Sequence, residues 1–257
     1  MDLMNRPESS LPTDSTSVDS LIRTLTELPK PLSQLVLDQI RDDKCRRDPL
    51  YWLQNHTKTR DDHWREKGTE PYARFPDLRY MPWLFEGFRT ERRLFIPKSR
   101  DMMVSWAVMG YLTWLAQWHG PCHILVQTQR EDKAKDLVSG QDVPGYVRTL
   151  YEQQDEFLKV LHPTTRPPSK MAGLEFTWEN GSRIQGLPSG AEQVRLYHPY
   201  CVFFDEAVYL DDFLGSYGAA EPVATQIIAV SSAGPSDFGD ISQRIMDKAK
   251  YKNPQLS

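Results

Sequence analysis

Two short apolar runs constrain the fold of this chain most. They are Tyr200–Phe204 (YCVFF) and Gln226–Val230 (QIIAV), and neither alternates between apolar and polar residues. A strand with one face in water alternates, whereas a parallel strand covered by helices on both faces does not. Both runs therefore predict buried parallel strands, and a third strand is predicted at His123–Thr128 (HILVQT).

Helical and hairpin patterns lie between these strands. Val104–Trp118 is apolar on nearly every face, too short to cross a bilayer and too long for a typical strand, so it predicts a buried helix. We expect its tryptophans, at positions 106, 114 and 118, to be core residues rather than base-stacking platforms. Further helices are predicted at about 130–138 and 143–161, and Asn180-Gly181 predicts a hairpin between 174–178 and 182–187. The pattern predicts a three-layer α/β sandwich with a mostly parallel central sheet.

The N-terminal quarter has a different character. Residues 1–18 are rich in Ser, Thr, Asp and Pro and contain no aromatic residue, which predicts a disordered tail. Residues 19–65 predict a helical extension, with Pro29 and Pro31 breaking its helical run. The α/β domain is expected to cover 66–257.

Composition excludes several classes of protein. The chain has 257 residues, a formal net charge of −4 and three scattered cysteines. No apolar run could span a bilayer, the polar N-terminus does not resemble a secretory signal, and the cysteines predict neither a disulfide framework nor a CxxC zinc site. These features predict a protein of a reducing cytosol that does not coat nucleic acid by bulk charge.

A carboxylate pair, Asp205-Glu206, ends one of the apolar strands. Open parallel sheets bind their ligands at this carboxyl edge. Hydrolysis of a nucleoside triphosphate uses one carboxylate to hold Mg²⁺ and another to orient or deprotonate water. We expect Asp205 in the first role and Glu206 in the second, although turns also favour acids for reasons unrelated to chemistry.

The turn before the buried helix resembles a phosphate-binding loop without its glycines. The segment follows the strand Leu94–Ile96 and places Ser105 at the helix start, where a hydroxyl is needed. Against GxxxxGKS/T, Lys98 and Met103 replace the glycines and Val104 replaces the lysine. Lys98 can still reach phosphate from the first position. The predicted nucleotide-binding residues are Lys98, Ser99, Arg100, Asp101, Met102, Met103, Val104 and Ser105.

Small hydroxyl residues end the neighbouring strand. Ser231 and Ser232 follow the apolar run 26 and 27 positions after Asp205. In ATPases with a phosphate-binding loop and a carboxylate pair of this kind, a polar residue at this position senses the γ-phosphate and couples hydrolysis to movement. A plain strand ending in a Ser/Gly turn is the alternative.

Taken together, these elements resemble the ATPase domain of the large terminase subunit, the DNA-packaging motor of tailed bacteriophages. The resemblance runs from about Asp48 to the C-terminus and implies a P-loop NTPase fold of the ASCE, RecA-like type. It makes 203–207 a Walker B segment and 231–233 a coupling motif. Arg100 matches the arginine inside the family's loop, and Arg195 matches one that acts across a subunit interface. The segment 78–84 resembles the adenine-recognition region, with Met81 where a glutamine is common.

The resemblance implies an ATP hydrolase that uses Mg²⁺ and translocates double-stranded DNA into a procapsid. Its implied partners are double-stranded DNA, the portal protein, the small terminase subunit and further copies of the chain in a ring. It implies action in the host cytoplasm, docked transiently on the procapsid. The family's nuclease domain is expected to be absent, so we expect no nuclease activity from these residues. A helicase-like ATPase and a non-catalytic scaffold with a degenerate loop stay open as alternatives.

Overall fold

The computed structural model describes residues 30–61, 64–99, 102–171, 173–232 and 239. The chain divides into two compact units, 1–45 and 46–257, which are described separately. Helix α2 (Lys30–Arg47) lies in the first unit except for its last two residues. Within it, the side chain of Gln34 donates a hydrogen bond of 2.7 Å to Asp38. Pro31 is its second residue, where the missing N–H removes no intrahelical bond. The expected tail and the helical run before Lys30 lie outside the described residues, and the domain boundary near residue 65 stays a prediction.

The second unit is built on a six-stranded sheet of order β3-β8-β7-β4-β6-β5. Every neighbouring pair is parallel except β5–β6, which is antiparallel. Gly181, with φ of +85°, lies in the turn that joins β5 to β6, as the Asn-Gly signal predicts. The strands are β3 (Arg93–Lys98), β4 (His123–Gln127), β5 (Glu175–Thr177), β6 (Arg183–Leu187), β7 (Cys201–Asp205) and β8 (Gln226–Ser232).

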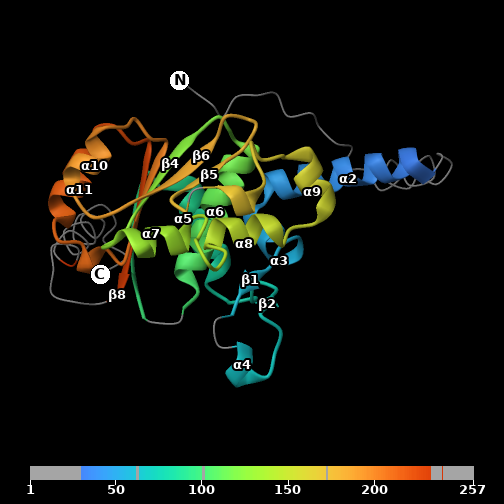
Figure 1. Ribbon diagram of the computed structural model, residues 1–257, viewed down its shortest axis with the longest axis horizontal. Coiled ribbons are helices and arrows are strands. Elements are labelled where there is room, and N and C mark those ends of the chain that lie inside the picture. The colour runs from blue at the N-terminus through green and yellow to red at the C-terminus, as the bar shows by residue number, and fades with distance from the viewer. Residues whose placement is uncertain (1–29, 62–63, 100–101, 172, 233–238, 240–257) are drawn as a thin grey trace, which may run out of the picture. The chain divides into compact units, whose positions relative to one another are not determined.

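Helices cover both faces of this sheet, which confirms the predicted three-layer sandwich (Figure 1). On one side lie α10 (Ala191–Arg195) and α11 (Phe213–Ala220), whose Val194 and Phe213 pack with Val202 and Phe204 of β7. Because strand side chains alternate between faces, Phe203 points to the opposite layer, and it is fully buried too. Burial on both faces explains why the strand reads as an uninterrupted apolar run.

The opposite layer contains α6 (Val104–Trp118), the predicted apolar helix, with α5 (Met81–Thr90) and α8 (Tyr146–Glu152) beside it (Figure 1). Trp106 and Trp114 are buried, as expected of core residues, and Trp118 is half-buried. The ring of Trp106 stacks on that of Tyr146 at 3.7 Å between centroids. The remaining elements are α3 (Pro49–Asn55), α4 (Trp64–Lys67), α7 (Glu131–Leu137), α9 (Glu156–Leu161) and the 3₁₀ turns η1 (Pro168–Lys170) and η2 (Ala207–Tyr209).

One predicted helix is wrong in extent. The run from 143 to 161 is divided into α8 and α9 by residues 153–155. The Asp155 amide donates to the carbonyl of His56 at 3.0 Å, and its carboxylate lies 2.7 Å from His56 Nδ1. These contacts with a residue 99 positions away interrupt the helix. The local sequence around Asp155 contains no pattern that predicts them.

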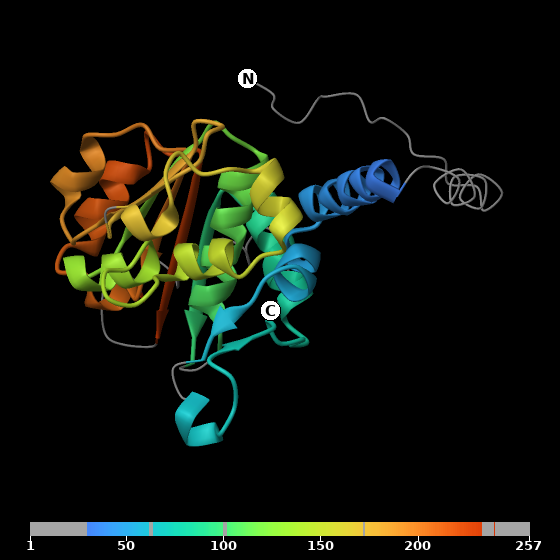
Figure 2. The same cartoon turned by 45° about the vertical axis from the view of Figure 1, so that its right-hand side comes forward.

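A small two-stranded sheet stands apart from the main one. It pairs β1 (Thr59–Arg60) with β2 (Tyr72–Ala73), and α4 projects beyond it (Figure 2). Within the part of the chain that the structure describes, no helix combines the length and apolar composition that a bilayer crossing needs.

Candidate active site

The parallel register brings the predicted site residues to one edge of the sheet. Lys98 at the end of β3 is the register partner of Ser232 at the end of β8, and Asp205 at the end of β7 pairs with Val230. Since β8 lies between β3 and β7, the three strands deliver their last side chains to the same place. Residues distant in the sequence therefore meet there.

Lys98 and Glu206 form the central ion pair of this edge. The Lys98 Nζ lies 2.9 Å from Glu206 Oε1, and the two side chains are 9 % and 36 % exposed, so solvent screens the pair only in part. The other carboxylate oxygen, Oε2, accepts from the Ser232 backbone amide at 3.2 Å and from its hydroxyl at 3.0 Å. Burial acts to raise the pKa of Glu206, but the bonds from Lys98 and Ser232 outweigh it, and the pKa lies below its ordinary value. Glu206 is thus held ionised by groups on two other strands.

Ser105 and Asp205 form the second contact, next to the first. The hydroxyl of Ser105, the second residue of α6, donates to Asp205 Oδ1 at 2.8 Å. Burial raises the pKa of Asp205 to about 6; the Ser105 bond lowers it and the charge of Glu206 adds to the rise. A serine hydroxyl and a carboxylate are oxygen donors of the kind that hold Mg²⁺ together with substrate phosphates and water. Their donor chemistry therefore fits Mg²⁺.

Backbone strain marks both halves of the site. Among the described residues other than glycine, those with positive φ are Met103 (+52°) and Glu206 (+48°). Met103 precedes the first residue of α6, and Glu206 precedes the turn η2. Left-handed backbone at residues with a side chain persists where surrounding contacts hold it, and such positions cluster at functional sites. Met103 also occupies the position of the second glycine in the usual loop, which explains why glycine is common there.

The two serines of the predicted coupling motif have different contacts. Ser232 holds the Glu206 carboxylate, as described above, whereas Ser231 is buried and accepts from the Val208 amide at 2.9 Å. Val208 lies in η2, the turn that begins directly after Glu206. Both serines thus act on the segment that carries Glu206, one on its side chain and one on its backbone.

The other predicted site residues lie in varied places. Ser99 is exposed and Met102 is half-buried beside the site, whereas Val104 is buried as the first residue of α6. Arg100 and Asp101 lie outside the described residues. Arg195 is the exposed last residue of α10, where its Nη1 lies 2.6 Å from Glu192. Its expected role across a subunit interface stays a prediction.

Tyr80 belongs to the site although no sequence pattern pointed to it individually. It directly precedes α5, and its hydroxyl donates to the backbone carbonyl of Met102. The hydroxyl therefore contacts the predicted phosphate loop from a segment 22 residues upstream. Its neighbour Met81, in the predicted adenine-recognition segment, is fully buried.

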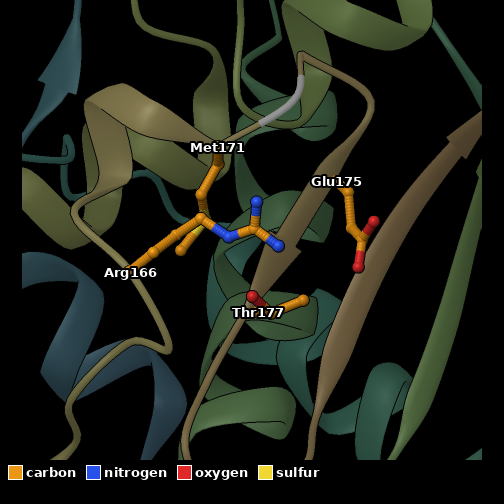
Figure 3. A pocket seen from close by; sticks show the side chains of 4 residues that line it. All are labelled: Arg166, Met171, Glu175 and Thr177. Atoms are coloured by element: carbon orange, nitrogen blue, oxygen red, sulfur yellow. The ribbon is translucent and has the colours of Figure 1, made fainter.

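A small cavity lies elsewhere, against strand β5 at the far edge of the sheet. Figure 3 shows the side chains of Arg166, Met171, Glu175 and Thr177 around it. Its volume of about 30 Å³ leaves room for only a few water molecules. It is far too small for a nucleotide, so it does not compete with the carboxyl edge as a candidate active site.

Comparison with known proteins gives matches among solved structures. No protein-family model and no curated protein matches the sequence. The crystal structure of the HK97 bacteriophage large terminase is similar with a TM-score of 0.52 and 12 % identity, over 81 % of this chain and 42 % of that one. The large terminase ATPase domain of Thermus phage P74-26 matches with a TM-score of 0.40 and 13 % identity, over 70 % of this chain and 72 % of that one.

The HK97 protein is a large terminase, the kind of protein that the sequence motifs resemble. At such low identity the HK97 similarity shows the fold alone, and it agrees with the expected three-layer α/β architecture. The chain spans less than half of the HK97 protein's length.

Proposed function

We propose that this chain is the ATPase motor domain of a viral DNA-packaging terminase, hydrolysing MgATP to drive double-stranded DNA into a procapsid. The observation that carries the proposal is the convergence of Lys98, Ser105 and the Asp205-Glu206 pair on one sheet edge through contacts of 2.8 and 2.9 Å. A cation for phosphate, oxygen donors for Mg²⁺ and a second carboxylate for water are the parts that phosphoryl transfer needs. The fold shared with a phage large terminase supports the choice of family.

Each site residue has its own role in this scheme. Ser105 and Asp205 would hold Mg²⁺, which when bound neutralises charge on the phosphate oxygens. Lys98 would bind the phosphates, and for this its ammonium must exchange Glu206 for phosphate oxygen. Glu206 would then orient or deprotonate the attacking water while Ser232 keeps its carboxylate in place. Arg100 and Arg195 are our candidates for stabilising charge in the transition state.

The larger assembly is proposed from the family resemblance. The portal protein, the small terminase subunit and a ring of copies docked on a procapsid in the host cytoplasm would complete the motor. An arginine supplied by a neighbour can contribute roughly 10³–10⁵ in rate. We therefore expect the isolated chain to hydrolyse ATP slowly and its specific activity to rise with protein concentration.

Nucleotide binding and phosphate release test the proposal. We expect the protein to bind ATP more tightly with Mg²⁺ than without, and Lys98→Ala to abolish turnover. Lys133→Ala is the matched control, since this exposed lysine of α7 pairs with a helix neighbour, Asp136, at 3.4 Å and lies outside the site. Thermal unfolding of both variants checks that they remain folded.

Three results would count against the proposal. Absence of ATP binding in the parent protein would support the scaffold alternative. Turnover in Lys98→Ala equal to that of the control would refute the role of that lysine. Strand displacement by the isolated chain, in place of turnover stimulated by double-stranded DNA, would favour the helicase-like alternative.

A further inference from the structure

The bond between Tyr80 and the predicted phosphate loop joins the residue before α5 to the loop before α6. The Tyr80 hydroxyl donates to the carbonyl of Met102, the residue immediately before the left-handed Met103. Tyr80 is half-buried, and burial raises the pKa of its hydroxyl, which keeps the hydroxyl protonated and able to donate.

The loop needs an external contact because of the backbone conformation of Met103. This residue has φ of +52° and ψ of 14°, a conformation that glycine adopts freely and a residue with a Cβ does not. The Met103 carbonyl accepts the first bond of α6, from the Ala107 amide at 2.9 Å. The helix start at Val104, and with it the direction of the Ser105 hydroxyl toward Asp205, therefore depends on Met103 keeping this conformation.

We infer that Tyr80 is a positioning residue of the nucleotide site, which holds Met103 left-handed through the Met102 carbonyl and so replaces the missing loop glycine. This inference rests on the proposed function, since the positioned group, the Ser105 hydroxyl, is a proposed Mg²⁺ ligand. Tyr80 is not a catalytic residue in this scheme, because it acts on the loop backbone and not on substrate.

The rest of α5 is anchored independently of this hydroxyl. Met81, Phe85 and Phe88 are buried, and the Phe88 ring stacks on Tyr111 of α6 at 5.1 Å between centroids. Removing the Tyr80 oxygen leaves these contacts in place. Tyr80→Phe should therefore fold normally, and its effect should be confined to the loop.

A double-variant cycle tests the inference. Tyr80→Phe should raise the dissociation constant of MgATP about five- to tenfold, the effect expected for loss of one hydrogen bond. In a Met103→Gly background, the left-handed conformation carries no steric penalty. There, Tyr80→Phe should change the dissociation constant of MgATP by less than about twofold. Tyr72→Phe, at a half-buried tyrosine of β2, is the matched control and should bind like the parent protein.

Hydrogen exchange without nucleotide gives a second measurement. Tyr80→Phe should speed exchange of the amides around 103–107, while those of β7 and β8 stay protected. A merely structural role would raise exchange throughout α5 and α6, and Met103→Gly would not correct it.

The outcomes separate this inference from the proposed function. If Lys98→Ala loses ATP binding while Tyr80→Phe binds like the parent, the role of Tyr80 is overturned and the ATPase proposal stands. An equal loss in the parent and Met103→Gly backgrounds also overturns it. If the parent does not bind ATP, the proposed function fails, and hydrogen exchange alone decides: faster exchange around Met103 in Tyr80→Phe supports the Tyr80 contact, and unchanged exchange refutes it.

Discussion

Replacing Asp205 by asparagine should stabilise the nucleotide-free protein at neutral pH and, under the proposed function, should remove its use of Mg²⁺. The carboxyl of Asp205 lies at the end of a buried strand, next to the Glu206 carboxylate, and its pKa is about 6 in the folded protein. An asparagine amide keeps the shape and can still accept the Ser105 hydroxyl bond, but it carries no charge to desolvate.

The size of the effect follows from linkage between ionisation and folding. A carboxyl whose pKa is raised by folding contributes stability below its unfolded value of 3.8. That contribution is lost as the pH rises through about 6, because ionisation then favours the unfolded chain. The difference between the two pKa values corresponds to at most about 3 kcal/mol of unfolding free energy above pH 7. Asp205→Asn should restore much of this unfolding free energy at about pH 8 and almost none of it near pH 4.

Urea unfolding of both proteins at a series of pH values measures this difference directly. We expect the stability gap between variant and parent to open between about pH 4 and 7, while MgATP turnover of the variant is lost. Asp136→Asn, at an exposed α7 carboxylate outside the site, is the matched control for the substitution itself. A gap that is independent of pH, or an asparagine variant less stable than the parent at about pH 8, would refute the assigned burial of the Asp205 charge.

Three further predictions concern other groups. Glu206→Gln should still bind MgATP but lose roughly 10²-fold or more in turnover, measured as phosphate release; unchanged turnover would exclude Glu206 as the base. If Arg195 acts on a neighbour's site, mixing Arg195→Ala with Glu206→Gln should restore part of the activity that each lacks alone, and an inactive mixture would argue against that arrangement. Burial and the charge of Arg183 lower the pKa of His123 to about 4, so the neutral His123 contributes stability above pH 6.5 that is lost as the pH falls toward 4. The stability of the parent relative to His123→Gln should therefore fall in acid-titrated unfolding, and a constant difference would contradict the shift.

The central strands and the buried helix were predictable because burial alone determines their patterns. Residues 201–204 of β7 and 227–230 of β8 are apolar because helices cover both faces of the sheet, and Val104–Trp118 is apolar on nearly every face because the helix is buried. Their strand-end residues could then be placed together from topology, without any knowledge of side-chain contacts. The parts of the site that follow from strand order, Lys98 near Asp205 above all, were within reach of the sequence.

The features that the sequence did not reveal depend on contacts between distant residues. The break between α8 and α9 comes from the contacts of Asp155 with His56. The Tyr80 bond to Met102 is likewise made to a backbone carbonyl, which leaves no mark on residue type. The loop around Met103 fails the glycine pattern because, under the inference above, its conformation is held from outside rather than permitted by its own composition.

The Lys98–Glu206 ion pair has a consequence for the timing of water attack. While the ammonium stays on the carboxylate, Glu206 is a poor proton acceptor, so a vacant site has little capacity for unproductive chemistry. Under the proposed function, arrival of a triphosphate draws the ammonium away, and the proton affinity of the carboxylate rises at the moment when a substrate is in place. Under this scheme, the position of the Lys98 side chain would make the basicity of Glu206 depend on whether a nucleotide is bound.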